Sequence, residues 1–174
     1  MAIIKEAFNA SWRDLVADPQ KRLEHIIKAL RDKGYRLTPQ RLAMLKILAK
    51  SAGHPSAEQI YEQIKADFPT TSLATIYKTL TLLKDMGEVL ELNFATVGSR
   101  YDGNKPYPHP HVICTECGRI LDPESTAVAG ISQEMARQTG YQITHHQLNF
   151  FGLCPKCQKE GQSAETKENE NGQE

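Results

Sequence analysis

The stretch His109-Pro-His111-Val-Ile-Cys114-Thr-Glu116-Cys117-Gly118-Arg-Ile-Leu-Asp122 constrains the fold most, because it gathers two imidazoles, two thiols and two carboxylates in fourteen residues. Cys114 and Cys117 form a C-x-x-C turn, and a second pair, Cys154 and Cys157, follows after 36 intervening residues. Four thiolates in two such turns are the donor set that tetrahedral structural zinc prefers. We therefore predict a four-cysteine Zn(II) site that ties this stretch to the later part of the chain.

The alternatives to zinc are two disulfides or four reduced core thiols. Both leave the ligand spacing of the two pairs unexplained, and these are the only cysteines in the chain. The segment MAIIKEAFNASWRDL carries charges where a secretion signal needs an apolar run, and no run of 18 apolar residues occurs. We expect a cytoplasmic protein without a membrane partner, and there C-x-x-C pairs hold metal more often than they form disulfides.

The charge of the chain is unevenly distributed, although its net value is zero. Residues 1–87 hold 14 Lys/Arg against 9 Asp/Glu, whereas residues 88–174 hold 7 against 12. A basic half joined to an acidic half suggests that the first half meets a polyanion. The 174 residues, 40% of them hydrophobic, can form one ordinary domain or two small ones.

The first half has the helix signals of a DNA-binding unit. Apolar residues at helical spacing predict a helix over 20–33. Thr38-Pro39, the capping box Ser56-Ala-Glu-Gln59 and Ser72 predict the starts of three more helices. Two strand-like runs follow, at 88–95 and 98–101. The last three helices and these runs predict a winged helix-turn-helix.

In a winged helix-turn-helix, the helix that starts at Leu73 lies in the major groove, and its first residues reach the bases. The candidate DNA-binding residues are Ser72, Thr75, Tyr77 and Lys78. The alternative is that Tyr77 packs in the core and Lys78 only faces solvent.

The second half has the pattern of a small α/β domain, which makes the whole chain α+β. Predicted strands lie at 89–95, 100–102, 111–114, 119–121 and 141–151, with a helix at 125–138. Because a small sheet with apolar strands tends to bury a face against a partner, we expect a two-fold homodimer. Because the zinc site ties the last strand to the first cysteine pair, folding of this half should need zinc. The predicted divisions are an N-terminal extension (1–20), a winged-helix DNA-binding domain (21–97), a dimerisation and metal-binding domain (98–158) and a disordered tail (159–174).

The histidines and aspartates that remain after the cysteines are assigned to zinc indicate a second metal site. His109, His111, Asp102 and Asp122 flank the same strands, and imidazoles with carboxylates suit Fe(II), Mn(II), Zn(II) or Ni(II). From spacing alone, His54 is a solvated residue before a helix. A non-haem iron enzyme with two His and one carboxylate is an alternative. We do not expect an enzyme, because nothing in the sequence resembles a substrate pocket.

The span from about Leu23 to Lys159 resembles the ferric uptake regulator (Fur) family, and within it the peroxide-sensing PerR branch. The matching stretches are Leu37-Thr-Pro-Gln-Arg41, His54-Pro-Ser-Ala-Glu58, Ser72-Leu-Ala-Thr-Ile-Tyr77, Ser99-Arg-Tyr-Asp102, His109-Pro-His111-Val-Ile-Cys114 and Gly152-Leu-Cys154-Pro-Lys-Cys157. The resemblance implies that the four cysteines hold structural zinc. It also implies a regulatory Fe(II) or Mn(II) site made of His54, Asp102, His109, His111 and Asp122.

The resemblance also indicates a branch and a function. Iron sensors of the family usually have Glu where this chain has Asp102 and Asp122, whereas peroxide sensors have Asp. A third metal site of some relatives should be absent, because two of its ligand positions are Pro108 and Pro110. The implied function is a dimeric repressor of oxidative-stress genes that binds a pseudo-palindromic operator in double-stranded DNA and senses hydrogen peroxide by iron-catalysed oxidation of His54 and His109. The alternative is an iron- or zinc-availability regulator that does not sense peroxide.

Overall fold

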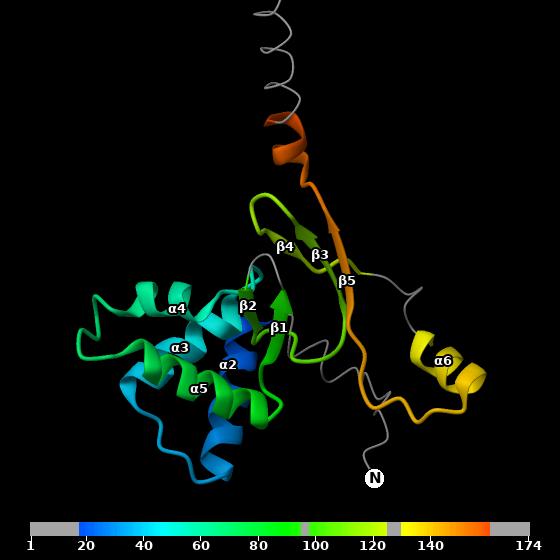
Figure 1. Ribbon diagram of the computed structural model, residues 1–174. Coiled ribbons are helices and arrows are strands. Elements are labelled where there is room, and N and C mark those ends of the chain that lie inside the picture. Colours follow the sequence, from blue (N-terminus) through cyan, green and yellow to red (C-terminus); the bar gives the residue numbers. More distant parts are fainter. Residues whose placement is uncertain (1–17, 95–97, 125–129, 161–174) are drawn as a thin grey trace, which may run out of the picture. The chain divides into compact units, whose positions relative to one another are not determined.

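The computed structural model describes residues 18–94, 98–124 and 130–160. The chain divides into two compact units, Met1–Tyr107 and Pro108–Glu174 (Figure 1). Most of the predicted N-terminal extension, residues 125–129 of the predicted helix and nearly all of the predicted tail lie outside the described residues. Within the described ranges, no helix has both the length and the apolar character that crossing a membrane requires.

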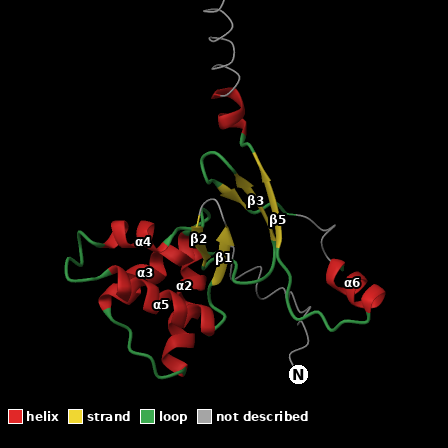
Figure 2. Cartoon of the chain, in the orientation of Figure 1, coloured by secondary structure: helices red, strands yellow, loops and turns green. Residues whose placement is uncertain are grey.

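Helices make up most of the described part of the first unit (Figure 2). They are α2 (Pro19–Asp32), α3 (Pro39–Lys50), α4 (Ala57–Ile64) and α5 (Leu73–Asp85). The Thr38, Ser56 and Ser72 side chains accept backbone N–H bonds at the starts of α3, α4 and α5, and Ser56 belongs to a complete capping box. These three predicted starts are confirmed. Asp18 caps α2, which therefore begins slightly earlier than the apolar pattern predicted.

The helices enclose one apolar core, to which a β-hairpin adds. The largest fully buried side chains of this core are Ile26, Leu30, Met44, Leu45, Leu48, Ile60, Ile76, Leu80 and Leu83. Strand β1 (Leu90–Phe94) pairs antiparallel with β2 (Gly98–Asp102), and Tyr101 of β2 packs against the core. Helices α3 to α5 followed by this hairpin confirm the winged-helix arrangement. The division predicted between residues 97 and 98 falls inside the hairpin, because β2 pairs with β1 and so belongs to the first unit.

The second unit is built on a three-stranded sheet. Its central strand β3 (Pro110–Cys114) pairs antiparallel with β4 (Ile120–Leu121) and parallel with β5 (Leu148–Gly152). Helix α6 (Ile131–Thr139) lies between β4 and β5 in the chain. The strand predicted over 141–151 is shorter at its start, because β5 forms only where the five residues of β3 pair with it. The mixed helix and sheet content confirms the α+β class.

One face of this sheet is apolar and exposed. Val112 of β3 lies opposite Leu121 of β4 and Phe150 of β5, so the three side chains form a row across the strands. They are 38%, 57% and 50% exposed. We call these three residues the apolar row.

Candidate metal centres and nucleic-acid interface

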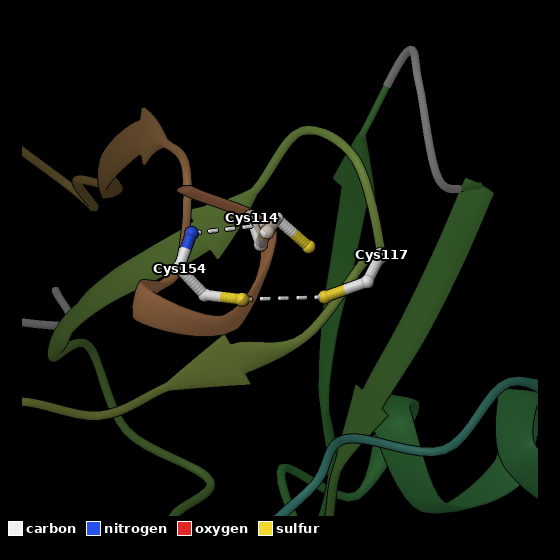
Figure 3. Close-up of side chains that lie close together, drawn as sticks. Cys114, Cys117 and Cys154 are labelled. Carbon is white, nitrogen blue, oxygen red and sulfur yellow. Dashed lines mark hydrogen bonds between the residues drawn. The ribbon is translucent and has the colours of Figure 1, made fainter. Parts of the chain in front are cut away.

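The structure brings the four cysteines of the second unit together. Their sulfur atoms all lie within 4.8 Å of one another. Figure 3 shows Cys117 and Cys154 pointing at each other, with 3.7 Å between their sulfurs. Four sulfurs placed tetrahedrally at about 2.3 Å from zinc are about 3.8 Å apart. The cluster therefore fits structural zinc in donor type, number and spacing.

The sheet explains why these cysteines meet. Cys114 ends β3, and Gly118 closes the knuckle with a φ of 67° and an N–H bond of 3.0 Å to the Cys114 carbonyl. Parallel pairing places Gly152 of β5 beside Cys114, so Cys154 follows at the same end of the sheet. The Cys154 N–H donates to the Cys114 sulfur at 3.3 Å (Figure 3). Backbone N–H groups of Cys117 and of Cys154 lower the pKa of the Cys114 thiol to about 6, which favours the thiolate that binds metal.

In the first unit, His54 and Asp102 form a buried pair. The distance from His54 Nε2 to Asp102 Oδ2 is 3.4 Å, and both side chains are about 1% exposed. The link between them is the backbone: the Tyr101 N–H of β2 donates to the Pro55 carbonyl at 3.1 Å. His54 has a φ of 50°, a conformation that costs free energy in a non-glycine residue and recurs at functional sites. The sequence-based reading of His54 as a solvated residue is wrong, and its burial agrees with a ligand role.

The Asp102 carboxylate is oriented by its own loop. Its Oδ1 accepts the backbone N–H groups of Asn104 at 2.9 Å and Lys105 at 2.8 Å. Its Oδ2 is therefore the oxygen that faces His54. The two backbone amides fix one oxygen of the carboxylate, and the other oxygen lies beside the imidazole. This is the arrangement of a metal ligand whose orientation is set by hydrogen bonds to groups that do not bind the metal.

In the second unit, His109, His111 and Asp122 converge. His109 immediately precedes β3, His111 lies within it, and Asp122 follows β4. Asp122 Oδ2 lies 3.4 Å from His109 Nε2, and Asp122 Oδ1 lies 3.9 Å from His111 Nε2. The two imidazole centroids are 4.3 Å apart. Antiparallel pairing of Val112 with Leu121 places Asp122 next to His111 and so explains the convergence.

The donors thus form two half-sites, one in each unit. The first half-site is His54 with Asp102, and the second is His109 with His111 and Asp122. Their nitrogen and oxygen atoms suit Fe(II), Mn(II) or Zn(II), and the absence of a thiolate from both sets removes the preference for soft metals. The donor chemistry of each half-site therefore fits a transition metal.

The four candidate DNA-binding residues lie on the exposed face of α5 and its cap. The Ser72 hydroxyl is 3.0 Å from that of Thr75. Tyr77 is 42% exposed, so its ring lies outside the core, and Lys78 is exposed as well. The Tyr77 hydroxyl donates to Glu58 Oε1 at 2.6 Å. This face offers hydroxyls, a phenol and a cation, the groups that contact bases and phosphates.

Sequence reasoning missed two residues that support these sites, Glu58 beside the DNA-binding face and Arg22 beside the first half-site. Glu58, which also accepts from the Ser56 hydroxyl at 2.7 Å, fixes Tyr77 from the neighbouring helix. Hydrogen bonds from Tyr77 and then from Ser56 lower the pKa of Glu58. Arg22 is fully buried near Asp102. A signal was present for Arg22, because positions 22, 26 and 30 share the buried stripe of α2 and the other two are apolar.

Comparison with known proteins gives consistent matches. The model of the ferric uptake regulator family matches residues 32–151. The peroxide-responsive repressor PerR of Staphylococcus aureus is 42% identical over 139 residues, which are 78% of this chain and 91% of that protein. The solved Campylobacter jejuni peroxide stress regulator is 33% identical at a TM-score of 0.60, covering 79% of this chain and 97% of the other. A zinc uptake regulator solved with zinc and DNA is 25% identical at a TM-score of 0.61, covering 83% and 97%.

Proposed function

Because the chain belongs to the ferric uptake regulator family, we propose that it is a metal-dependent transcriptional repressor that senses hydrogen peroxide. The observation that carries this proposal is the division of the His/Asp donors between two units, each with its donors already clustered. The names of the peroxide-responsive relatives support the sensing step. The aspartates at positions 102 and 122 support it too, because the chain resembles the peroxide sensors of the family in having Asp there.

In the proposed mechanism, the donors of both half-sites would hold one Fe(II) or Mn(II) ion. His54 and Asp102 would bind it from the first unit, and His109, His111 and Asp122 would bind it from the second. An ion that needs both half-sites favours the one arrangement of the units in which all five donors reach it. Shifting such an equilibrium from 1:99 to 99:1 needs about 5.5 kcal/mol of differential affinity. Loss of one ligand should therefore be enough to weaken the bound arrangement.

In the peroxide step, imidazole rings of the protein itself are oxidised. Fe(II) held by these donors would supply catalytic redox chemistry toward hydrogen peroxide with no net change in its own oxidation state, whereas Mn(II) would not. One peroxide oxygen adds to a ring carbon of His54 or His109, whose C–H becomes C–OH, and the other oxygen leaves as water. The ring loses two electrons and peroxide gains them. An oxidised ring is a poorer metal ligand, so the metal should be released. The protein then loses the arrangement of its units that binds DNA.

DNA recognition is proposed for α5 in a homodimer. The exposed face with Ser72, Thr75, Tyr77 and Lys78 would enter the major groove. The apolar row is suited to cover the same row of a second copy, since apolar side chains that are 38% to 57% exposed gain from burial. Two α5 helices related by a two-fold axis would then read a pseudo-palindromic operator.

The test is mass spectrometry of the peptides that hold His54 and His109, after hydrogen peroxide is added to Fe(II)-loaded and to Mn(II)-loaded protein. We expect one added oxygen atom on these histidines with iron only, accompanied by loss of operator binding. Intact histidines and retained operator binding with both metals would contradict peroxide sensing. They would leave a regulator of iron or zinc availability.

A further inference from the structure

We propose that Arg22 is a positioning residue for the regulatory metal, because it holds the loop that follows Asp102 and orients its carboxylate. This inference rests on the proposed metal site and extends it to a residue outside the five-ligand set. Arg22 lies in α2, before the segment 32–151 that the family model matches. The inference therefore depends on the contacts of Arg22 in this chain.

The Arg22 guanidinium joins three parts of the first unit. Its Nε donates to the Gly103 carbonyl at 2.8 Å, directly after Asp102. Its Nη1 donates to Glu88 Oε2 and its Nη2 to the Glu88 carbonyl, both at 2.7 Å. The guanidinium thus connects helix α2 to the start of the β-hairpin and to the loop after β2. A guanidinium can serve three such acceptors at once because its N–H groups are fixed in a fork.

The loop has little freedom on its other side. A Cβ atom on Gly103 would lie 2.7 Å from Leu48 Cβ and 3.3 Å from the Leu48 backbone. Gly103 is therefore pressed against α3 while Arg22 holds its carbonyl. The two contacts fix the peptide that follows Asp102, and the Asn104 and Lys105 amides then orient the carboxylate. Each link in this chain of contacts is a short hydrogen bond or a close packing contact.

The charge of Arg22 is balanced locally. Burial lowers the pKa of Arg22, and the hydrogen bond and charge of Glu88, with a smaller contribution from Asp102, act in the opposite direction. Glu88 also lies 3.3 Å from His25 Nε2. Glu88, 2.7 Å from Nη1, is therefore the main counter-charge of Arg22. Arg22 thus orders the loop while Glu88 limits repulsion of the metal.

The experiment measures Mn(II) affinity of full-length, zinc-loaded protein from the free-ion electron paramagnetic resonance signal. Arg22→Met and Arg22→Lys are compared with wild type. Lys restores a cation beside Glu88 but lacks the fork that reaches Gly103. We expect both variants to bind Mn(II) roughly 10- to 100-fold more weakly, as when outer-shell partners of a metal ligand are lost. Arg31→Met is the matched control, because Arg31 is exposed on the same helix, and it should bind normally.

Thermal unfolding separates positioning from general stability. Arg22→Met should also unfold at a lower temperature, since it leaves Glu88 buried without its cation. Arg22→Lys should recover stability yet still bind Mn(II) weakly, which a purely structural role does not predict. Wild-type Mn(II) affinity in Arg22→Lys would overturn the inference, even if Arg22→Met failed to fold. Asp102→Asn tests the site itself: if it binds Mn(II) normally, the proposed metal site is wrong, whereas weak binding by Asp102→Asn alone refutes only the role of Arg22.

Discussion

Single backbone contacts decide where the donors of the first half-site lie. His54 and Asp102 are far apart in sequence, and the Tyr101 N–H bond to the Pro55 carbonyl brings their segments together. The left-handed φ of His54 is tolerated because Pro55 is held by that bond and Ser56 caps α4. The geometry of this pair is therefore a property of the fold and not of local sequence.

Gly103→Ala should damage the same half-site by a steric route. The added methyl group would lie 2.7 Å from Leu48 Cβ, so the loop or α3 must move. We expect a loss of about 1–3 kcal/mol in the free energy of unfolding, the usual cost of overpacking, and weaker Mn(II) binding. Urea denaturation measures the first and Mn(II) titration the second. Gly53→Ala is the stability control, because nothing lies within 4 Å of its added Cβ. Equal stability of the two variants would show that the loop is not tightly packed.

Residue by residue, the site was predictable where the donors are close in the chain. The cysteine pairs, with His109, His111 and Asp122, stand out because their spacing matches metal ligands. His54 could be assigned only through family resemblance, since one histidine before a proline carries no spacing signal. Arg22 was missed because a charged residue in a helix is normally exposed. Its position on the apolar stripe of α2 was a weak signal, and its contacts with Glu88 and Gly103 show the burial directly.

Among the elements, helix starts were predictable because their causes are local. Thr38, Ser56 and Ser72 each cap the helix that follows with their own side chains. Strand lengths were less predictable, because a strand lasts only as long as its partner. The run from Tyr141 alternates well enough for a long strand, yet only Leu148–Gly152 pairs with β3. A sequence pattern does not contain the length of a distant partner strand.

Helix α5 should lose part of its DNA affinity when Lys78 is replaced by Ala. If this exposed lysine contacts a phosphate, its removal should weaken binding to all sequences and reduce the slope of log affinity against log salt by about 1. Fluorescence anisotropy with Mn(II)-loaded protein at several salt concentrations measures both. Lys156→Ala removes an equal charge from the second unit, at a residue with 69% side-chain exposure, and should change neither. An unchanged salt slope in Lys78→Ala would place this residue outside the interface.

At the level of the whole molecule, the two units differ in what stabilises them. The first unit has a large apolar core drawn from four helices and the hairpin. In the described part of the second unit, the buried hydrophobic residues are Ile113, Cys114 and Ile120, and α6 buries no residue. Such a small core leaves a three-stranded sheet dependent on additional links. The four-cysteine cluster supplies one link, and burial of the apolar row in the proposed dimer would supply another.

Removal of zinc should therefore unfold the second unit and spare the first. Structural zinc contributes folding free energy directly, and Cys154→Ser removes one of its four ligands. We expect the variant to lose zinc, to become monomeric by light scattering, and to lose hydrogen-exchange protection in β3 and β5. Protection in α2 to α5 should persist, because their core contains no zinc ligand. Since β3 carries His111 and ends at Cys114, regulatory metal binding should be lost together with zinc. A zinc-free variant that stays dimeric with a protected β3 would mean that the apolar row alone holds this unit together.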